Sequence, residues 1–219
     1  RLGLHPDKPL ETIARSTVSL VTDGFYEAVE RGDIVLHKRS EIVELMAGNA
    51  RLSSGEVVPA DIIVCGTGWH QRCAFLDPDV LSKVTDEQGN FRLYRSILPV
   101  DMPRLAFNGY NSSFFSQLNC EVAALWLADY LNGGFLLPSN QQQNSDIDAR
   151  LAWMEARTDG KHSKGTNIIP FSIHNIDELL GDMNMNVGRF RQFLQWIGAL
   201  QPKSYGYLLP QLQKKYTDK

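Results

Sequence analysis

The chain has 219 residues, of which 43% are hydrophobic and 21% charged, and its formal net charge is −3. This length suits one large domain or two small ones, and the composition is ordinary for a globular protein. The net charge excludes the basic surface of a nucleic-acid-binding protein, and the longest apolar stretches are too short to span a membrane. Three cysteines without metal-binding spacing, and no opening signal-peptide pattern, lead us to expect a reducing, cytoplasmic location.

The first third of the chain predicts one short helix followed by strands. The helix is expected over residues 25–30, with Asp23 as its cap and Gly32 at its end. Apolar runs bounded by turn residues predict strands at 33–38, 41–46, 50–52 and 61–66. The second and third of these are expected to pair as a hairpin, because a Gly-Asn turn lies between them.

The rest of the chain is expected to be mostly helical. A loop over 70–90 leads to short strands at 91–97 and 104–109. Apolar residues at helical spacing predict a helix at 117–131, and three further helices are expected at 147–157, 175–182 and 187–200. Residues 138–146 are rich in Gln, Asn and Ser and are interpreted as a surface linker, and residues 201–219 as an extended tail.

The most informative segment is the apolar run from Ile62 to Cys65 and the Gly66-Thr67-Gly68-Trp69 sequence that follows it. An apolar run without alternation is typical of a parallel strand that is buried on both faces, so Cys65 is expected to be buried. Small residues at the carboxyl end of such a strand lie where open α/β sheets bind their ligands. The two glycines would let the backbone approach a bulky group closely.

This segment, with Asp61 before it, resembles the return strand of the flavin-containing monooxygenases and other class B flavoprotein monooxygenases. Residues 93–99, 103–110 and 117–126 are similar to later segments of that family. The resemblance runs from about residue 10 to about residue 200 and is most specific between 57 and 138. Cys65, Trp69 and Ala74 depart from the commoner residues, and Ala74 argues against the N-hydroxylating subtype.

The resemblance implies the closing part of a Rossmann-like α/β flavoprotein with two dinucleotide-binding domains and a helical C-terminal region. Residues 1–60 would form the end of the NADPH-binding domain and the crossover to the FAD-binding domain. Residues 61–138 would form the C-terminal part of the FAD-binding domain, and residues 139–219 the helical C-terminal region and tail. The family's two Gly-x-Gly-x-x-Gly loops are absent from this sequence. We therefore expect a carboxy-terminal portion that lacks the amino-terminal FAD-binding half and is inactive alone.

The implied reaction is NADPH- and FAD-dependent monooxygenation. One oxygen atom from O₂ would pass through a C4a-(hydro)peroxyflavin to a soft nucleophile, such as an amine or sulfide, or to a ketone. The cofactor-binding residues would be Thr67, Gly68 and Trp69, together with Ser116, Gln117 and Asn119 at a helix N-terminus that faces the flavin. Ser116 is expected to be the N-cap, while no catalytic residue and no metal site is assigned.

Two alternatives stay open at this point. A disulfide-type reductase shares the two-domain architecture, but its Cys-x-x-Cys pair does not occur here. A non-catalytic docking or dimerisation module would use residues 138–219 as its surface. The expected partners of the monooxygenase are a small-molecule substrate, the missing amino-terminal half and a second copy in a homodimer, with no nucleic acid and no membrane span. Trp126 and Trp153 are expected in the core, and Lys214-Lys215 on a solvated face.

Overall fold

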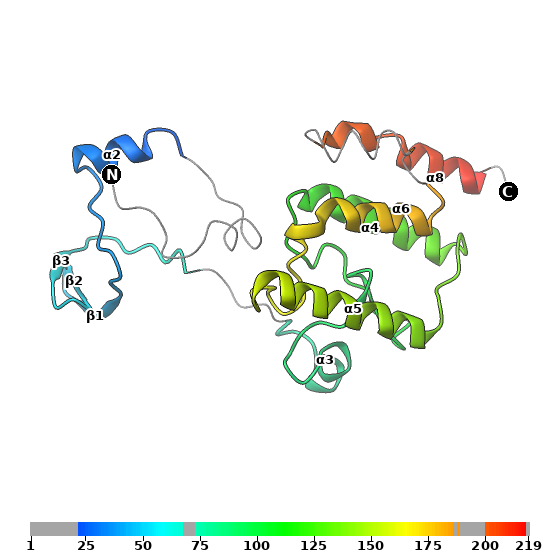
Figure 1. Cartoon of the computed structure of the whole chain (residues 1–219), viewed down its shortest axis with the longest axis horizontal. Coiled ribbons are helices and arrows are strands. Elements are labelled where there is room, and N and C mark those ends of the chain that lie inside the picture. The colour runs from blue at the N-terminus through cyan, green and yellow to red at the C-terminus, as the bar shows by residue number, and fades with distance from the viewer. Residues whose placement is uncertain (1–21, 68–72, 186–187, 189–199, 218–219) are drawn as a thin grey trace. The chain divides into compact units, whose positions relative to one another are not determined.

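A computed structural model describes residues 22–67, 73–185, 188 and 200–217. This part of the chain is mixed α/β, with long helices and short strands (Figure 1). It divides into two compact units, a smaller one within residues 22–67 and a larger one from residue 73 onwards. The expected α/β class is confirmed at this level.

The smaller unit contains a three-stranded antiparallel sheet preceded by one helix. Its elements are α2 (Phe25–Arg31), β1 (Ile42–Met46), β2 (Asn49–Leu52) and β3 (Val57–Pro59). β2 pairs with both neighbours, so the hairpin predicted over 41–52 is confirmed. The helix is confirmed as well and ends at Gly32, whose φ of 81° is in the left-handed region that glycine adopts easily. Asp23 does not cap it, because Gly24 occupies the N-cap.

Two strands expected in this unit are wrong. Residues 33–38 and 61–66 have no strand structure, and Ile62 and Val64 are 84% and 87% exposed. Cys65 is exposed as well and not buried as expected. A strand that is buried on both faces needs neighbouring strands for its hydrogen bonds and helices over its faces, and residues 22–67 supply only β1, β2 and β3.

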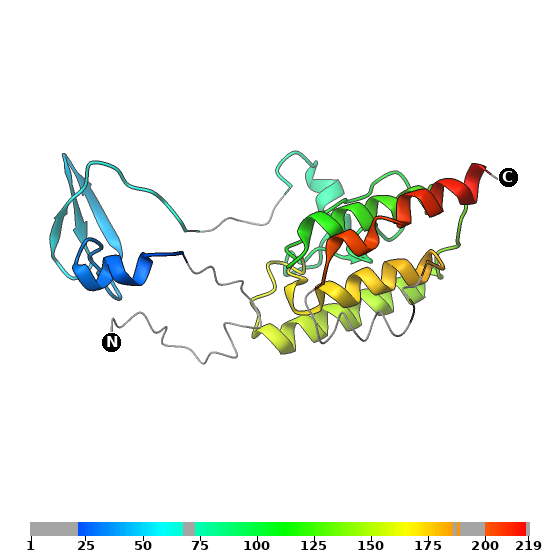
Figure 2. The same ribbon diagram turned by 90° about the horizontal axis from the view of Figure 1, so that it is seen from above.

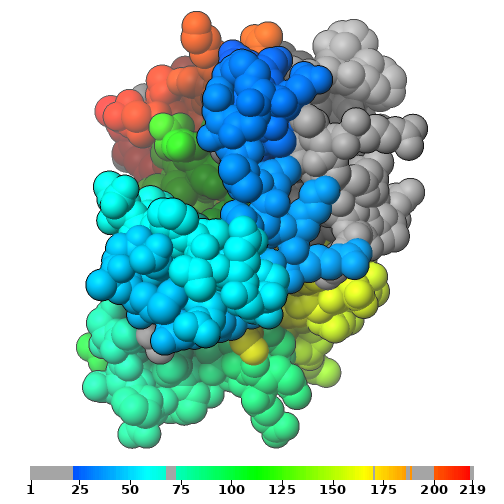
Figure 3. Space-filling view, turned by 90° about the vertical axis from the view of Figure 1, so that its left-hand side faces the viewer, coloured from blue at the N-terminus to red at the C-terminus, as the bar shows by residue number. Residues whose placement is uncertain are grey.

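The smaller unit accordingly has very little interior. Among its described residues only Ala50 and Leu52 are buried, whereas Val43 and Leu45 on β1 are 60% and 69% exposed. Figure 3 faces this unit, whose blue and cyan atoms are open to view. A three-stranded sheet of this size needs further apolar cover for independent stability.

The larger unit is a group of helices that run alongside one another. They are α4 (Ser116–Leu131), α5 (Asn140–Thr158), α6 (Ser172–Asp182) and α8 (Leu208–Thr217). α4 contacts both α6 and α8, and the two ribbon views agree on this arrangement (Figures 1 and 2). The prediction of the helix over 117–131 is confirmed to within one residue, as is that of the helix over 175–182 apart from its start.

The core of this unit lies where α4, α6 and α8 meet. Trp126 is fully buried, as expected, whereas Trp153 on α5 is 43% exposed and is not a core residue. The central side chains come from four helices and are Leu118, Val122, Trp126, Ile147, Ile176, Leu179, Leu180, Leu208 and Leu212. Burying a side chain of this size contributes roughly 1.5–3 kcal/mol.

A smaller apolar cluster supports the short strands of this unit. Phe91, Phe107 and Tyr110 pack ring against ring, with centroids 4.9–5.9 Å apart. The remaining elements of the larger unit are α3 (Pro78–Val84), β4 (Leu93–Tyr94), β5 (Leu98–Pro99) and the 3₁₀ turns η1 (Ile169–Phe171) and η2 (Pro202–Tyr205), of which α3 and β4 contribute to this cluster. The expected loop over 70–90 thus contains a helix, the strand over 91–97 is shortened to a hairpin, and residues 104–109 form no strand.

Two further expectations for the larger unit are wrong. Residues 138–146 do not form a linker, because α5 begins at Asn140 and the Ser139 hydroxyl accepts a hydrogen bond from the Gln142 N–H at 3.3 Å. Residues 201–219 are not an extended tail, since they contain η2 and α8. The helix expected over 187–200 falls outside the described residues, except for Gly188 and Leu200. Across the described ranges, no helix combines the length and apolarity needed to cross a membrane.

Candidate functional site

The first group of candidate residues lies at the end of the smaller unit. Thr67 is exposed and has no regular structure. Gly68 and Trp69 lie outside the described residues, so the close approach expected at Gly68 stays a prediction. The backbone from Asp61 to Thr67 is exposed throughout and is not sealed inside packed side chains.

The second group lies at the N-terminus of α4. The N-cap position is held by Phe115, whose side chain caps nothing, so the expectation that Ser116 is the N-cap is wrong by one residue. Ser116 instead donates its hydroxyl to the Ser113 carbonyl at 3.0 Å and accepts the Ser113 N–H at 3.4 Å. Gln117 is exposed. The first N–H groups of a helix have no partner within it, and they carry a partial positive charge.

Asn119 points into the protein and not out of the helix end. It is 1% exposed, and its amide donates to the Ser113 hydroxyl at 2.7 Å and to the Phe115 carbonyl at 3.1 Å. Its Oδ1 accepts a hydrogen bond from Asn175 on α6 at 3.0 Å. Asn119 therefore ties the loop before α4 to the α4–α6 interface.

One buried polar atom in the loop before α4 lacks a partner. The Oδ1 atom of Asn111 is buried and accepts no hydrogen bond from any described residue. Buried acceptors are nearly always satisfied, so each exception requires an explanation. This acceptor belongs to the loop that leads into α4, which begins at Ser116.

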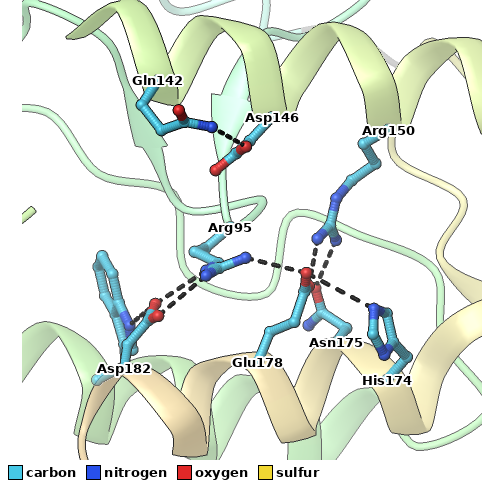
Figure 4. A network of polar contacts seen from close by, with 9 residues as sticks. Arg95, Gln142, Asp146, Arg150, His174, Asn175, Glu178 and Asp182 are labelled. Atoms are coloured by element: carbon cyan, nitrogen blue, oxygen red, sulfur yellow. Dashed lines mark hydrogen bonds and ion pairs between the residues drawn. The ribbon is translucent and has the colours of Figure 1, made fainter. Parts of the chain in front are cut away.

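The most extensive polar network of the larger unit is centred on Arg95 and was not expected from the sequence. Arg95 donates to Asp182 from two nitrogens at 2.8 and 2.9 Å and lies 3.0 Å from Glu178. Glu178 also pairs with Arg150 of α5, and Arg150 donates to the Asn175 Oδ1 at 3.2 Å. Figure 4 shows Arg95 between the two carboxylates, with Arg150 and Asn175 around Glu178.

The surroundings of Arg95 hold it charged and in place. Burial by itself lowers its pKa, but the hydrogen bonds and charge of Asp182, with the charge of Glu178, raise the pKa above its ordinary value. The indole N–H of Trp126 donates to the same Asp182 at 3.0 Å. Arg95 has a φ of 55°, a left-handed value that is uncommon for a residue with a side chain. The turn between β4 and β5 therefore holds Arg95 in an unfavourable backbone conformation, and from this position its guanidinium reaches the two carboxylates.

This network continues the one that starts at the N-terminus of α4. Asn175 donates to Asn119 and accepts from Arg150, so hydrogen bonds run from Ser113 to the Arg95 cluster. Apart from Ser113 and Asn119, which are six residues apart, the partners are 25 to 87 residues apart in the sequence, and no local spacing could have indicated them. Groups of three or more His, Cys, Asp or Glu side chains suited to a metal ion do not occur among the described residues.

The chain is similar in sequence to curated flavin monooxygenases, although no protein-family model matches it. It is 26% identical over 221 residues to "Probable flavin-containing monooxygenase 1" of Arabidopsis thaliana, a match that covers 98% of this chain and 41% of that protein. It is 31% identical over 110 residues to "Flavin-containing monooxygenase FMO GS-OX2" of the same plant, covering 50% of this chain and 24% of that one. A fungal "FAD-dependent monooxygenase" from Pyrenophora dematioidea is 23% identical, with 75% and 39% covered.

A solved structure shares the fold. The S-allyl-L-cysteine S-oxygenase from Allium sativum superposes with a TM-score of 0.54 at 20% identity, covering 81% of this chain and 43% of the other. The chain thus spans about two fifths of the length of the first curated relatives and of this structural neighbour.

Proposed function

Because this chain is a relative of the flavin-containing monooxygenases, we propose that it forms the carboxy-terminal portion of an FAD- and NADPH-dependent monooxygenase. The observation that carries the proposal is the match to "Probable flavin-containing monooxygenase 1" over 98% of this chain and only 41% of that protein. The substrate class we propose is a soft nucleophile, such as an amine or sulfide, or a ketone. The missing amino-terminal half would supply the glycine-rich loops that hold the cofactor phosphates.

Two features near the N-terminus of α4 support the proposal that the flavin ring binds there. The pyrimidine edge of the isoalloxazine presents an N–H between carbonyl groups, and this edge becomes negatively charged on reduction. Unpaired N–H groups at the start of α4 would donate to the carbonyl side, and the Asn111 Oδ1 is an unsatisfied buried acceptor in the adjoining loop. The partial positive charge of the helix end favours the reduced ring.

We propose different roles in this site for the cofactor-binding residues that were predicted from the sequence. Gln117 is exposed and Ser116 half-buried, so both can reach a ligand at the helix end. Asn119 is buried with its hydrogen-bonding groups occupied, so it would act by fixing Ser113 and the loop. Thr67, Gly68 and Trp69 remain proposed cofactor-binding residues on the basis of the sequence resemblance. When bound, FAD supplies the oxygen chemistry, with NADPH as reductant, and these residues orient the ring and exclude water.

The test is made on the longer protein that includes the region before Arg1. We expect bound FAD, NADPH oxidation that depends on a sulfide, amine or ketone, and one atom of ¹⁸O₂ in the product. Removing the side chains of Ser116 and Gln117 together should weaken FAD retention, while Gln211→Ala at an exposed position of α8 should not. NADPH oxidation that passes electrons to an acceptor without ¹⁸O in any product would refute the proposal and favour the reductase alternative.

The 219-residue chain itself provides a second test. Because it lacks both glycine-rich loops, we expect FAD to bind weakly or not at all when titrated into it. A tight, stoichiometric yellow complex of this chain with FAD would contradict the fragment proposal. Size measurement with and without FAD would reveal the docking-module alternative, because a dimerisation module associates without the cofactor.

A further inference from the structure

The larger unit contains an open groove of about 630 Å³ that the proposed flavin site does not use. One wall is a stripe of α5 residues at helical spacing, and the other comes from η1 and α6, with Arg95 at the base. The residues that line it are Arg95, Asp146, Ala149, Arg150, Trp153, Arg157, Phe171, His174 and Glu178. Its volume lies within the roughly 300–1,000 Å³ typical of small-molecule pockets.

One end of the groove is an aromatic corner. The Trp153 and Phe171 rings meet edge to face, with centroids 5.3 Å apart and planes at 85°. Trp153 is nevertheless 43% exposed, so much of its ring is open to solvent in the groove that it lines. An exposed aromatic corner of this kind offers a flat ligand both a ring edge and a ring face.

Positive charge is concentrated at the same end. The Arg157 guanidinium lies 5.6 Å above the Trp153 ring, and no described carboxylate is within ion-pair distance of it. Arg150 lies 5.1 Å above the Phe171 ring and uses two of its nitrogens for Glu178 and Asn175. A guanidinium carries five N–H donors, so both arginines have N–H groups left for a ligand.

Three arginines around the groove face three carboxylates, Asp146, Glu178 and Asp182, so the groove has no excess positive charge for a multiply charged anion. The two inner arginines, Arg95 and Arg150, are balanced by Glu178 and Asp182. Asp146 lines the opposite end and accepts a hydrogen bond from Gln142. Arg157 alone is left to attract an anion, and a doubly charged group such as phosphate would meet the carboxylates that line the groove.

We propose that the groove between α5 and α6 binds an aromatic monocarboxylate, with its ring on Trp153 and Phe171 and its carboxylate on Arg157 and Arg150. The planar guanidinium fork matches a carboxylate with two parallel hydrogen bonds. This site is separate from the N-terminus of α4 and requires no cofactor, so it stands or falls independently of the proposed monooxygenase.

The test uses 2-naphthoate as the probe and the 219-residue chain as the protein. The indole N–H signal of Trp153 is assigned in an NMR spectrum by its loss in Trp153→Phe, and its shift is followed during the titration. We expect saturable binding that moves this signal. Naphthalene-2-carboxamide, cyclohexanecarboxylate and inorganic phosphate serve as the neutral, non-aromatic and dianionic comparisons, and each should bind at least about tenfold more weakly.

Two variants and one matched control locate the site. Arg157→Gln should raise the Kd for 2-naphthoate about tenfold or more, because a charge-assisted hydrogen bond is lost. Trp153→Leu should raise it about three- to tenfold through loss of the ring contact. Arg104→Gln removes an exposed arginine outside the groove and should leave the Kd unchanged. All three positions are exposed, so the folded spectrum should persist.

Several results would overturn the proposal. Unchanged 2-naphthoate affinity in Arg157→Gln would show that the probe binds elsewhere, for example on the exposed apolar residues of the smaller unit. If naphthalene-2-carboxamide bound as tightly as 2-naphthoate, the negative charge would have no role in binding. If phosphate bound more tightly than 2-naphthoate, the groove would be an anion site that does not recognise the aromatic ring. No shift of the Trp153 signal at millimolar probe would show that the groove takes no such ligand.

Discussion

Lys215 and Tyr216 of helix α8 bind the buried carboxylate of Asp129 on α4, and the contribution of this contact to stability can be measured. Asp129 is 0% exposed and lies 2.9 Å from the Lys215 ammonium and 2.5 Å from the Tyr216 hydroxyl. Lys215, predicted to be solvated, is 29% exposed in this pair. The two substitutions Lys215→Met and Asp129→Asn break the same ion pair from opposite sides.

The structure predicts unequal effects for the two changes. Lys215→Met leaves a fully buried carboxylate without its counter-charge, and such a loss costs about 3–5 kcal/mol. Asp129→Asn leaves the charge on Lys215, which is partly exposed and can be hydrated, so the cost is about 1.5–3 kcal/mol. Going by the middle of each range, Lys215→Met should therefore destabilise the packing of α8 on α4 by about 1–2 kcal/mol more than Asp129→Asn.

Native-state hydrogen exchange of α4 and α8 amides measures these differences. It reports the opening free energy of each helix, and the result is independent of the smaller unit. Lys214→Met is the matched control, because Lys214 is the exposed neighbour of Lys215 and its loss should change stability by less than about 0.5 kcal/mol. Equal effects of Lys215→Met and Asp129→Asn, or effects no larger than that of the control, would refute the reasoning about the buried carboxylate.

Three further predictions concern the same unit. Burial and the hydrogen bond to Asp129 raise the pKa of Tyr216 to about 12. The folded state therefore keeps a proton that the unfolded state releases near pH 10. The free energy of unfolding should fall between about pH 10 and 12. Tyr216→Phe should make that fall smaller in pH-dependent urea unfolding, where buried Tyr94, whose pKa is also raised, still contributes, and an unchanged pH profile would disprove the assignment. Gly134→Ala should destabilise by about 1–3 kcal/mol in the same assay, because the new Cβ would overlap the Asp129 carboxylate and the Tyr216 hydroxyl; no change would mean that the loop shifts freely. Asn175→Ala should cost about 1–3 kcal/mol, since Asn119 is left buried without that donor, whereas Gln141→Ala at an exposed helical position should be neutral.

Elements that depend on local pattern were predicted well. The helix over 117–131 combines apolar residues at helical spacing with a Gly-Gly stop, and the structure begins it at Ser116. The Gly-Asn turn likewise located the β1–β2 hairpin. The segment over 138–146 was misjudged by composition, although Ser139 provides a cap and Gln is a good helix former.

Elements that depend on distant partners were not predictable in this way. The run over 61–66 has the composition of a buried strand, but within the described residues it joins neither the β1-β2-β3 sheet nor the β4-β5 pair. The ion pairs of Arg95 could not be predicted from the sequence, because Glu178 and Asp182 are brought to it only by tertiary folding. At the candidate site, the position of the helix end was predicted, whereas the inward orientation of Asn119 follows from Asn175 on another helix.

The bare apolar run from Ile62 to Cys65 has a practical consequence for anyone who produces this chain by itself. Four uncharged residues, three of them β-branched, are held in the open with their backbone groups available to other molecules. Such segments template intermolecular sheets, and a single flanking acid at Asp61 gives little protection against this. The chain should therefore precipitate as its concentration rises.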